Sequence, residues 1–256
     1  MPANGRKRLG ILMSGGLDSY LAYHYATLAC GHRPEEILPM WFDLGQPYAG
    51  KERRAIESYE FETRVIRLDL IRAEFNNVPT IHDQIIPGRN MILATVAASF
   101  ADTIWMCALR GEMHDFMVDK NDKFFTLASE ALSYTFGTPV KVDSPFRHLT
   151  KTDLIAWALE HGISPKRLAR TSTCYHEELH NCGSCSTCFK RKSAMLLNGI
   201  EEPFITEPFL TPYAQSMRQK MRSALETQDF SHYNLARIEE THRAFLKAGV
   251  EGITTN

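Results

Sequence analysis

The sequence predicts an α/β protein built on a doubly wound, mostly parallel sheet of five strands. Short β-branched or aromatic runs alternate with helical stretches over the first 165 residues, which is the pattern of successive β-α-β units. A Gly-rich turn directly after the first apolar run indicates a ligand-binding loop. Four closely spaced cysteines later in the chain indicate a small metal-stabilised subdomain.

We expect the strands at about residues 9–14, 36–43, 63–69, 103–109 and 139–143. We expect the intervening helices near residues 18–30, 50–61, 90–101, 122–136 and 151–161. The 90–101 helix is almost wholly apolar, which suits burial and makes it the expected interface of a homodimer. The pattern is lost at residues 71–89, where we expect a mobile loop.

Three regions follow from this pattern: a sheet domain at 1–165, a zinc-binding subdomain at 166–200 and a helical C-terminal extension at 201–256. In the extension Met217, Met221 and Leu225 follow one helical face, and Leu235, Ile238 and Phe245 suggest a second helix. We expect these helices to dock on the main domain, because amphipathic terminal helices usually complete a core. A partner-binding arm is the alternative.

The composition is that of an ordinary globular protein. The 256 residues are 44% hydrophobic and 23% charged, with a net charge of -1. This balance disfavours sequence-independent binding to long nucleic acid, so a small-molecule substrate fits better. No stretch approaches the roughly 18 apolar residues of a membrane span, and residues 1–8 lack a signal-peptide core. We therefore expect a cytoplasmic protein without membrane contact.

The first apolar run is followed directly by Ser14, Gly15, Gly16, Leu17, Asp18 and Ser19. Backbone N–H groups at such a strand-to-helix turn lack intrahelical partners and lie at the positive end of the helix dipole, so they can bind an anion. The spacing matches neither the nucleotide P-loop nor the dinucleotide fingerprint. An ordinary turn between strand and helix is the alternative.

The cysteine cluster has the spacing C-x7-C-x2-C-x2-C. Four thiolates so placed can surround one tetrahedral Zn²⁺ and leave no open position, so we expect one structural zinc per chain. The ligands are Cys174, Cys182, Cys185 and Cys188. An iron–sulfur cluster remains the alternative for this ligand set. Cys30 and Cys107 stand alone in apolar surroundings, and we expect them to be buried thiols.

Several segments in one order resemble a known family. They are the 14–19 loop, Pro87-Gly88-Arg89-Asn90, Gly111-Glu112, Asp115-Phe116, Ser144-Pro145, Leu149-Thr150-Lys151, Thr173-Cys174-Tyr175 and the cysteine cluster leading to Arg191. The loop is similar to the pyrophosphate loop of the ATP pyrophosphatase superfamily, which implies an adenine nucleotide α-hydrolase-like fold. The whole set resembles the 7-cyano-7-deazaguanine synthase family over roughly residues 9–197.

The resemblance implies an ATP-dependent ligase that converts 7-carboxy-7-deazaguanine and ammonia to 7-cyano-7-deazaguanine through adenylate and amide intermediates. ATP is the implied co-substrate, with Mg²⁺. The implied ATP-binding residues are Leu12, Met13, Ser14, Gly15, Gly16, Leu17, Asp18 and Ser19. The implied catalytic residues are Asp18, Ser19, Lys151 and Arg191. The implied substrate-binding residues are Arg89, Asn90, Glu112, Asp115 and Asp119.

Each implied residue has a role in keeping with its charge. Ser14 and Ser19 are expected to hold pyrophosphate, and Asp18 to cap the helix or help hold Mg²⁺. Lys151 and Arg191 are expected to neutralise phosphate or the substrate carboxylate. Glu112, Asp115 and Asp119 are the candidates for accepting hydrogen bonds from the N–H pair of the deazaguanine. A buried pair of acceptors discriminates strongly against ligands that lack these donors.

The chain departs from the family pattern in two loops. Pro47 and Tyr48 follow Gln46 where the family has an Arg-His pair, and residues 116–120 are shortened and altered. These changes favour an altered substrate more than an altered use of ATP. A diverged relative that stops at the amide, or joins a deazaguanine acid to an amine of a protein or other macromolecule, is one alternative. A non-catalytic, zinc-stabilised nucleotide-binding module is another.

Overall fold

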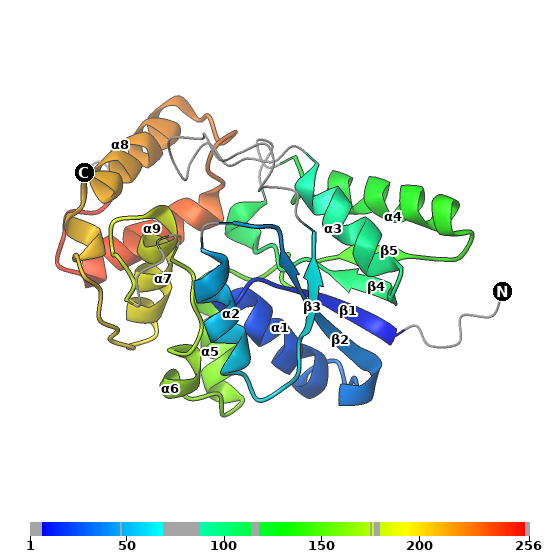
Figure 1. Ribbon diagram of the computed structural model, residues 1–256. Coiled ribbons are helices and arrows are strands. Elements are labelled where there is room, and N and C mark those ends of the chain that lie inside the picture. The colour runs from blue at the N-terminus through cyan, green and yellow to red at the C-terminus, as the bar shows by residue number, and fades with distance from the viewer. Residues whose placement is uncertain are drawn as a thin grey trace. The chain divides into compact units, whose positions relative to one another are not determined.

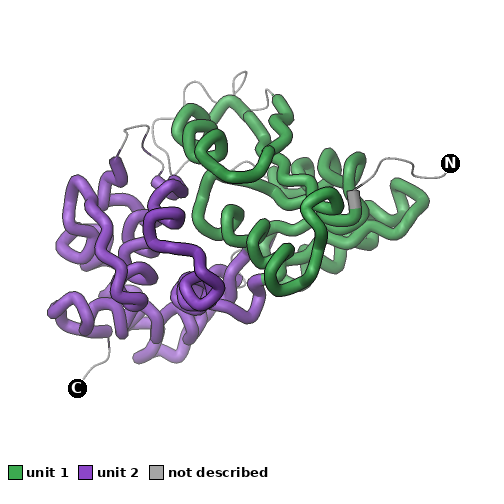
Figure 2. Tube along the Cα trace, turned by 90° about the horizontal axis from the view of Figure 1, so that it is seen from below, with its two compact units in different colours: residues 1–107, 119–145 green, residues 108–118, 146–256 purple. Residues whose placement is uncertain are grey.

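The computed structural model describes residues 7–46, 48–68, 88–113, 118–174, 176 and 180–253. The chain divides into two compact units, shown in different colours in Figure 2. Unit 1 comprises residues 1–107 and 119–145, and unit 2 comprises residues 108–118 and 146–256. The predicted division at residues 165 and 200 stays a prediction.

Unit 1 contains a five-stranded sheet in which every neighbouring pair is parallel. Its strands are β1 (Lys7–Met13), β2 (Ile37–Asp43), β3 (Arg64–Arg67), β4 (Ala101–Trp105) and β5 (Lys141–Asp143). The order is β3-β2-β1-β4-β5, so β1 lies at the centre with Leu12 opposite Met40 and Ile11 opposite Trp105. The predicted parallel α/β fold is confirmed.

The helices of unit 1 cover both faces of this sheet (Figure 1). They are α1 (Leu17–Leu28), α2 (Ala49–Glu57), α3 (Arg89–Ala98) and α4 (Asp122–Phe136), with the short η1 (Pro34–Glu36). The chain moves outward in one direction from β1 to β3 and in the other from β4 to β5. Right-handed crossovers then put α1 and α2 on one face and α4 on the other. Ligands bind where this order reverses, beyond the carboxyl end of β1.

The 90–101 prediction merges a helix end with a strand start. Helix α3 ends at Ala98, and Ala101 already pairs with Lys7 of β1. Alanine is compatible with both elements, so composition alone did not show where the ladder begins. The mobile loop expected at 71–89 lies almost wholly outside the described residues. The expected burial of Cys30 is wrong, because that residue is exposed just beyond the end of α1, and Cys107 is only partly buried.

Unit 2 is helical. Its elements are η3 (Arg110–Glu112), α5 (Lys151–Glu160), α6 (Pro165–Leu168), α7 (Ser186–Leu197), η4 (Pro208–Leu210), α8 (Pro212–Thr227) and α9 (Leu235–Lys247). The tail helices α8 and α9 pack with α7 around Phe189, whose ring centroid lies 5.6 Å from that of Phe245. The tail helices thus pack inside unit 2, with α7 as their main support, and their docking on the sheet domain stays a prediction. No helix of the described residues has the length and apolar character needed to cross a membrane.

Candidate functional site

The 14–19 loop joins β1 to α1 and is closed by its two serines. The Ser19 hydroxyl lies 3.2 Å from the Ser14 backbone nitrogen, which donates to it, and 3.3 Å from the Ser14 hydroxyl. Ser19 in turn donates to the Gly16 carbonyl at 3.1 Å. Ser19 is buried, whereas Ser14 is exposed. The loop is thus held from inside while its first hydroxyl faces solvent.

The start of α1 has the features of an anion site. Gly16 occupies the N-cap position and offers no side-chain acceptor to the N–H groups of the first turn. These groups are the ones that bind phosphate at the positive end of a helix dipole. Asp18 lies within the first turn, so the cap position expected for it belongs to Gly16. Met13 is buried in β1 and Leu12 is partly buried.

Gly15 is required by both conformation and space. Its φ of +66° is in the left-handed region, and a Cβ there would lie 2.9 Å from the backbone Cα and oxygen of Glu52. Backbone atoms cannot move aside as a flexible side chain would. The Tyr59 hydroxyl also donates to the Gly15 carbonyl at 2.7 Å. The loop is therefore held by Glu52 of α2 and by Tyr59, which lies just beyond the end of that helix.

Glu52, on α2, places a partly buried carboxylate beside this loop. Its Oε2 accepts hydrogen bonds from Trp41 Nε1 at 2.9 Å and from Gln46 Nε2 at 2.7 Å. Gln46 Oε1 accepts from the Leu44 N–H at 2.8 Å, which fixes the amide orientation in this arrangement. The Glu52 side chain thus connects α2 to the end of β2 through these two hydrogen bonds.

Burial raises the pKa of Glu52 to about 7, because removal from water disfavours the charged form. The hydrogen bonds from Trp41 and Gln46 and the positive charge of Arg89 lower the pKa in part, whereas Asp43 raises it. The carboxyl group therefore titrates near neutral pH. Such perturbed groups are enriched at functional sites.

The start of α3 carries two of the expected substrate residues. Gly88, with φ +72°, is the N-cap, and Arg89 and Asn90 begin the helix. The Asn90 side chain is buried, and its Nδ2 donates to the Asp119 carbonyl at 3.0 Å. This bond brings Asn90 together with the segment that carries Asp119. Asp115 lies outside the described residues.

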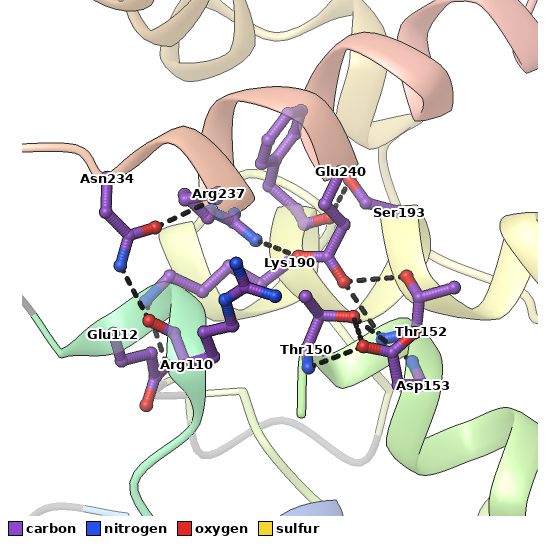
Figure 3. Close-up of polar contacts among 11 residues, drawn as sticks. Arg110, Glu112, Thr150, Thr152, Asp153, Lys190, Ser193, Asn234, Arg237 and Glu240 are labelled. Atoms are coloured by element: carbon purple, nitrogen blue, oxygen red, sulfur yellow. Dashed lines mark hydrogen bonds and ion pairs between the residues drawn. The ribbon is translucent and has the colours of Figure 1, made fainter. Parts of the chain in front are cut away.

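In unit 2, Lys151 is the first residue of α5 and lies within the capping box of that helix. Thr150 Oγ1 accepts from the Asp153 N–H at 3.2 Å, and Asp153 Oδ2 accepts from the Thr150 N–H at 2.9 Å. Lys151 is buried rather than at the surface. Glu112, on η3, forms an ion pair with Lys190 of α7 at 3.2 Å (Figure 3). Any ligand of Glu112 must therefore share or displace Lys190.

Arg191 is buried within unit 2, and its side chain is held by protein groups. Its Nε and one terminal nitrogen donate to the two carboxylate oxygens of Glu202, both at 2.6 Å. The other terminal nitrogen donates to Thr171 Oγ1 at 2.7 Å. A bidentate pair of this kind satisfies the guanidinium fork. The geometry favours a structural role, and phosphate neutralisation by Arg191 stays a prediction.

The four predicted cysteines form one buried cluster. Their sulfur atoms all lie within 4.8 Å of one another, and the Sγ atoms of Cys182 and Cys188 are 3.8 Å apart. Tetrahedral zinc with Zn–S bonds of about 2.3 Å places its sulfur ligands about 3.8 Å apart. Thr187 Oγ1, 3.1 Å from Cys185 Sγ, provides a hydroxyl in the surrounding shell. The cluster can hold a metal ion, and its donor set fits structural zinc.

The knuckle between the second and third cysteines depends on Gly183. Its φ is +80°, and a Cβ there would overlap the Thr206 carbonyl oxygen. The Thr206 N–H donates to the Cys182 carbonyl at 3.0 Å, so residues after α7 close over the cluster. The metal site is therefore held in unit 2 by α7, which carries Cys188, and by the segment around Thr206.

Glu52 and Tyr59 are site residues that the sequence reasoning missed. One signal was present for Glu52: it shares a helical face with Ala55 and Ile56, both buried. A carboxylate on the apolar face of an amphipathic helix is expensive unless it has partners. Tyr59 gave no comparable signal, because a tyrosine side chain packed at the edge of a hydrophobic core is common in proteins.

A parallel α/β sheet whose central strand ends in a Gly-rich turn at the topological switch point defines a protein of the doubly wound class, which binds its ligands at that edge of the sheet. A family model described as "Queuosine biosynthesis protein QueC" matches residues 9–199. The chain belongs to this family. The match ends before α8 and α9.

Curated relatives named 7-cyano-7-deazaguanine synthase are similar over most of the chain. The protein from Archaeoglobus fulgidus is 29% identical over 227 residues, covering 77% of this chain and 89% of the relative. The one from Porphyromonas gingivalis is 28% identical over 217 residues, covering 75% and 94%. The one from Thermoplasma acidophilum is 25% identical over 245 residues, covering 85% and 99%.

Proposed function

We propose that the protein is an ATP-dependent ligase that converts 7-carboxy-7-deazaguanine and ammonia to 7-cyano-7-deazaguanine. The observation that carries this proposal is the 14–19 loop, whose closed serine pair and uncapped helix start suit pyrophosphate. Family membership and the names of the relatives support the deazaguanine substrate.

The chemistry makes an oxygen into a leaving group twice. A carboxylate oxygen of the substrate attacks the α-phosphorus of ATP, and pyrophosphate departs. Ammonia then attacks the activated carbonyl carbon, AMP leaves, and loss of a proton gives the amide. In the second round the amide oxygen attacks the α-phosphorus of another ATP and pyrophosphate again departs. Departure of AMP with loss of two N–H protons then gives the nitrile. Positioning and charge neutralisation supply most of the catalysis.

The residue roles follow from charge and location. Ser14, Ser19 and the N–H groups at the start of α1 hold pyrophosphate, and Asp18 helps to hold the Mg²⁺ that accompanies ATP. Lys151 neutralises phosphate or the substrate carboxylate. Glu112 or Asp119 accepts the N–H pair of the deazaguanine. Four cysteines hold zinc in a structural role.

Incubation with ATP, ammonium and 7-carboxy-7-deazaguanine tests the proposal, with pyrophosphate and product mass as readouts. Release of pyrophosphate with formation of the nitrile is expected. Release with formation of the amide, or of an adduct with a macromolecular amine, would replace the end product and leave the adenylation step in place. The altered sequence after Gln46 and at residues 116–120 is the observation that favours this second candidate. Absence of pyrophosphate with every deazaguanine acid would indicate a binding module.

A further inference from the structure

The C-terminal helix α9 begins at a residue that also bonds a distant loop. Asn234 is the N-cap of α9, and its Oδ1 accepts from the Arg237 N–H at 3.0 Å. Its Nδ2 donates to the Arg110 carbonyl at 2.6 Å (Figure 3). The same Nδ2 donates to the Met113 carbonyl at 3.3 Å. One amide therefore starts a helix and bonds both ends of the 110–113 segment, which contains Glu112.

The next turn of α9 packs on the same segment. A Cβ added to Gly111 would lie 3.5 Å from Arg237 Cδ, so the Arg237 side chain is in contact with Gly111. Arg237 is buried, and one of its terminal nitrogens donates to Glu240 Oε2 at 3.0 Å. The other, NH2, has no hydrogen-bond partner in the described part of the chain. The Arg237 side chain thus packs on the 110–113 segment, and Glu240 fixes the orientation of the Arg237 guanidinium.

Glu240 extends the contact to the start of α5. Its Oε1 accepts from the Thr152 backbone N–H at 2.9 Å and from the Thr152 hydroxyl at 2.6 Å. Asn198, the C-cap of α7, donates to the Thr152 carbonyl at 3.1 Å. Thr152 is the neighbour of Lys151, so α9 holds the backbone on which that lysine sits. Both segments bonded by α9 carry a residue expected in the reaction.

The helix lies beyond the part of the chain that the family model matches. We propose that α9 is a positioning element of the substrate site, in which Asn234 fixes the 110–113 segment so that Glu112 can bind the deazaguanine acid. The ligand class rests on the proposed function. The tail is then required for substrate affinity as well as for the core that surrounds Phe189.

Asn234→Asp separates these two tasks. A carboxylate still accepts from the Arg237 N–H and keeps the cap, but it cannot donate to the two carbonyl groups. The KM for 7-carboxy-7-deazaguanine is expected to rise roughly fivefold to tenfold, because both hydrogen bonds that the amide donates are lost. The KM for ATP is expected to stay unchanged, and the thermal midpoint is expected to fall only slightly, because the cap is kept while the two donated hydrogen bonds are lost. Amide hydrogen exchange in a peptide covering residues 108–113 is expected to become faster.

Asn121→Asp is the matched control. Asn121 is the N-cap of α4, where its Oδ1 accepts from the Phe124 N–H at 2.9 Å. Among the described residues, the Asn121 side chain donates no hydrogen bond to a loop. This variant is expected to change none of the measured quantities.

Unchanged exchange and unchanged KM in Asn234→Asp would overturn the inference. So would a loss of thermal stability with equal effects on both substrates, which would make the contact merely structural. A wild-type protein that releases no pyrophosphate overturns the proposed function instead. Hydrogen exchange then decides the positioning claim by itself, and equal rates in both proteins would refute it.

Discussion

Gln46 and Glu52 are joined by a hydrogen bond of 2.7 Å from Nε2 to Oε2, across the turn that connects β2 to α2. Trp41 donates to the same oxygen. The carboxyl group is neutral or charged depending on pH in the range where the protein is expected to work, since its pKa is raised to about 7 by burial. This pair therefore makes the stability of the contact between α2 and the 14–19 loop depend on pH.

The first prediction concerns stability against pH. The folded pKa of Glu52 lies above its ordinary value, so the neutral form is favoured by folding. Its stabilising contribution is complete below about pH 4.5 and is lost as the pH rises through about 7. Glu52→Gln stays neutral and can still accept both hydrogen bonds. At pH 8 its free energy of unfolding should exceed that of the wild type by up to about 3 kcal/mol, and at pH 5 by little.

Chemical denaturation at several pH values measures this difference. Glu57→Gln is the control, because Glu57 lies on the same helix but is exposed and pairs only with Arg53 in the described contacts, at 2.8 Å. It should follow the wild type at every pH. Parallel curves for wild type and Glu52→Gln would show that the carboxyl group titrates normally.

The second prediction concerns the loop glycine. Gly15→Ala must place a methyl group against the backbone of Glu52 and adopt a positive φ, so it should lose roughly 1–3 kcal/mol of stability and lose pyrophosphate release. Gly137→Ala is matched in conformation, with φ +64° and nothing within 4 Å of the added Cβ. It should cost about 1 kcal/mol and keep activity. Equal effects of the two changes would mean that space at Gly15 is irrelevant.

The third prediction concerns Asp18. Its carboxylate lies in the first turn of α1, where its interaction with the helix dipole contributes about 0.3–1 kcal/mol to stability. Asp18→Ala should therefore remain folded while pyrophosphate release is lost. Asp122→Ala, which removes the first-turn acid of α4, should keep full activity. Circular dichroism and a pyrophosphate assay on the same samples decide the matter, and an unfolded Asp18→Ala would make the residue structural.

The sequence was sufficient for those features that have a local pattern. The alternation of β1 to β5 with α1 to α5 is predicted by the hydrophobic period and the length of each apolar run. The spacing of the four cysteines predicts their cluster. Gly15 and Gly183 stand in motifs that need a positive φ, which only glycine adopts easily.

Contacts between distant residues could not be predicted in this way. Glu112 meets Lys190 across 78 positions, and Asn234 meets Arg110 across 124. Nothing in the local pattern around either residue specifies such a partner, because the pairing depends on how the helices of unit 2 pack. The same applies to Arg191, whose charge suggests a phosphate partner but gives no indication of the ion pair with Glu202.

The fourth prediction separates the two roles of Arg191. Lysine cannot reproduce the bonds to Glu202, Thr171 and the Leu168 carbonyl together. Arg191→Lys should therefore destabilise the protein by about 3 kcal/mol, the usual cost of disturbing a buried pair. Arg53→Lys, at an exposed pair, should cost less than about 1 kcal/mol. Full stability with lost pyrophosphate release in Arg191→Lys would instead support phosphate neutralisation.

The fifth prediction concerns the metal. Cys185→Ser removes one of four sulfur ligands, and structural zinc contributes on the order of 10 kcal/mol in small zinc domains, so metal and stability should be lost together. Cys30→Ser removes an exposed thiol outside the cluster and should change neither. Metal analysis of the wild type should give one zinc per chain, whereas iron with sulfide would identify the cluster as iron–sulfur. A strong chelator should unfold unit 2. A stable, metal-free Cys185→Ser protein would refute the structural role of the metal, because the turn at Gly183 and the hydrogen bond from Thr206 to the Cys182 carbonyl would then persist without an ion.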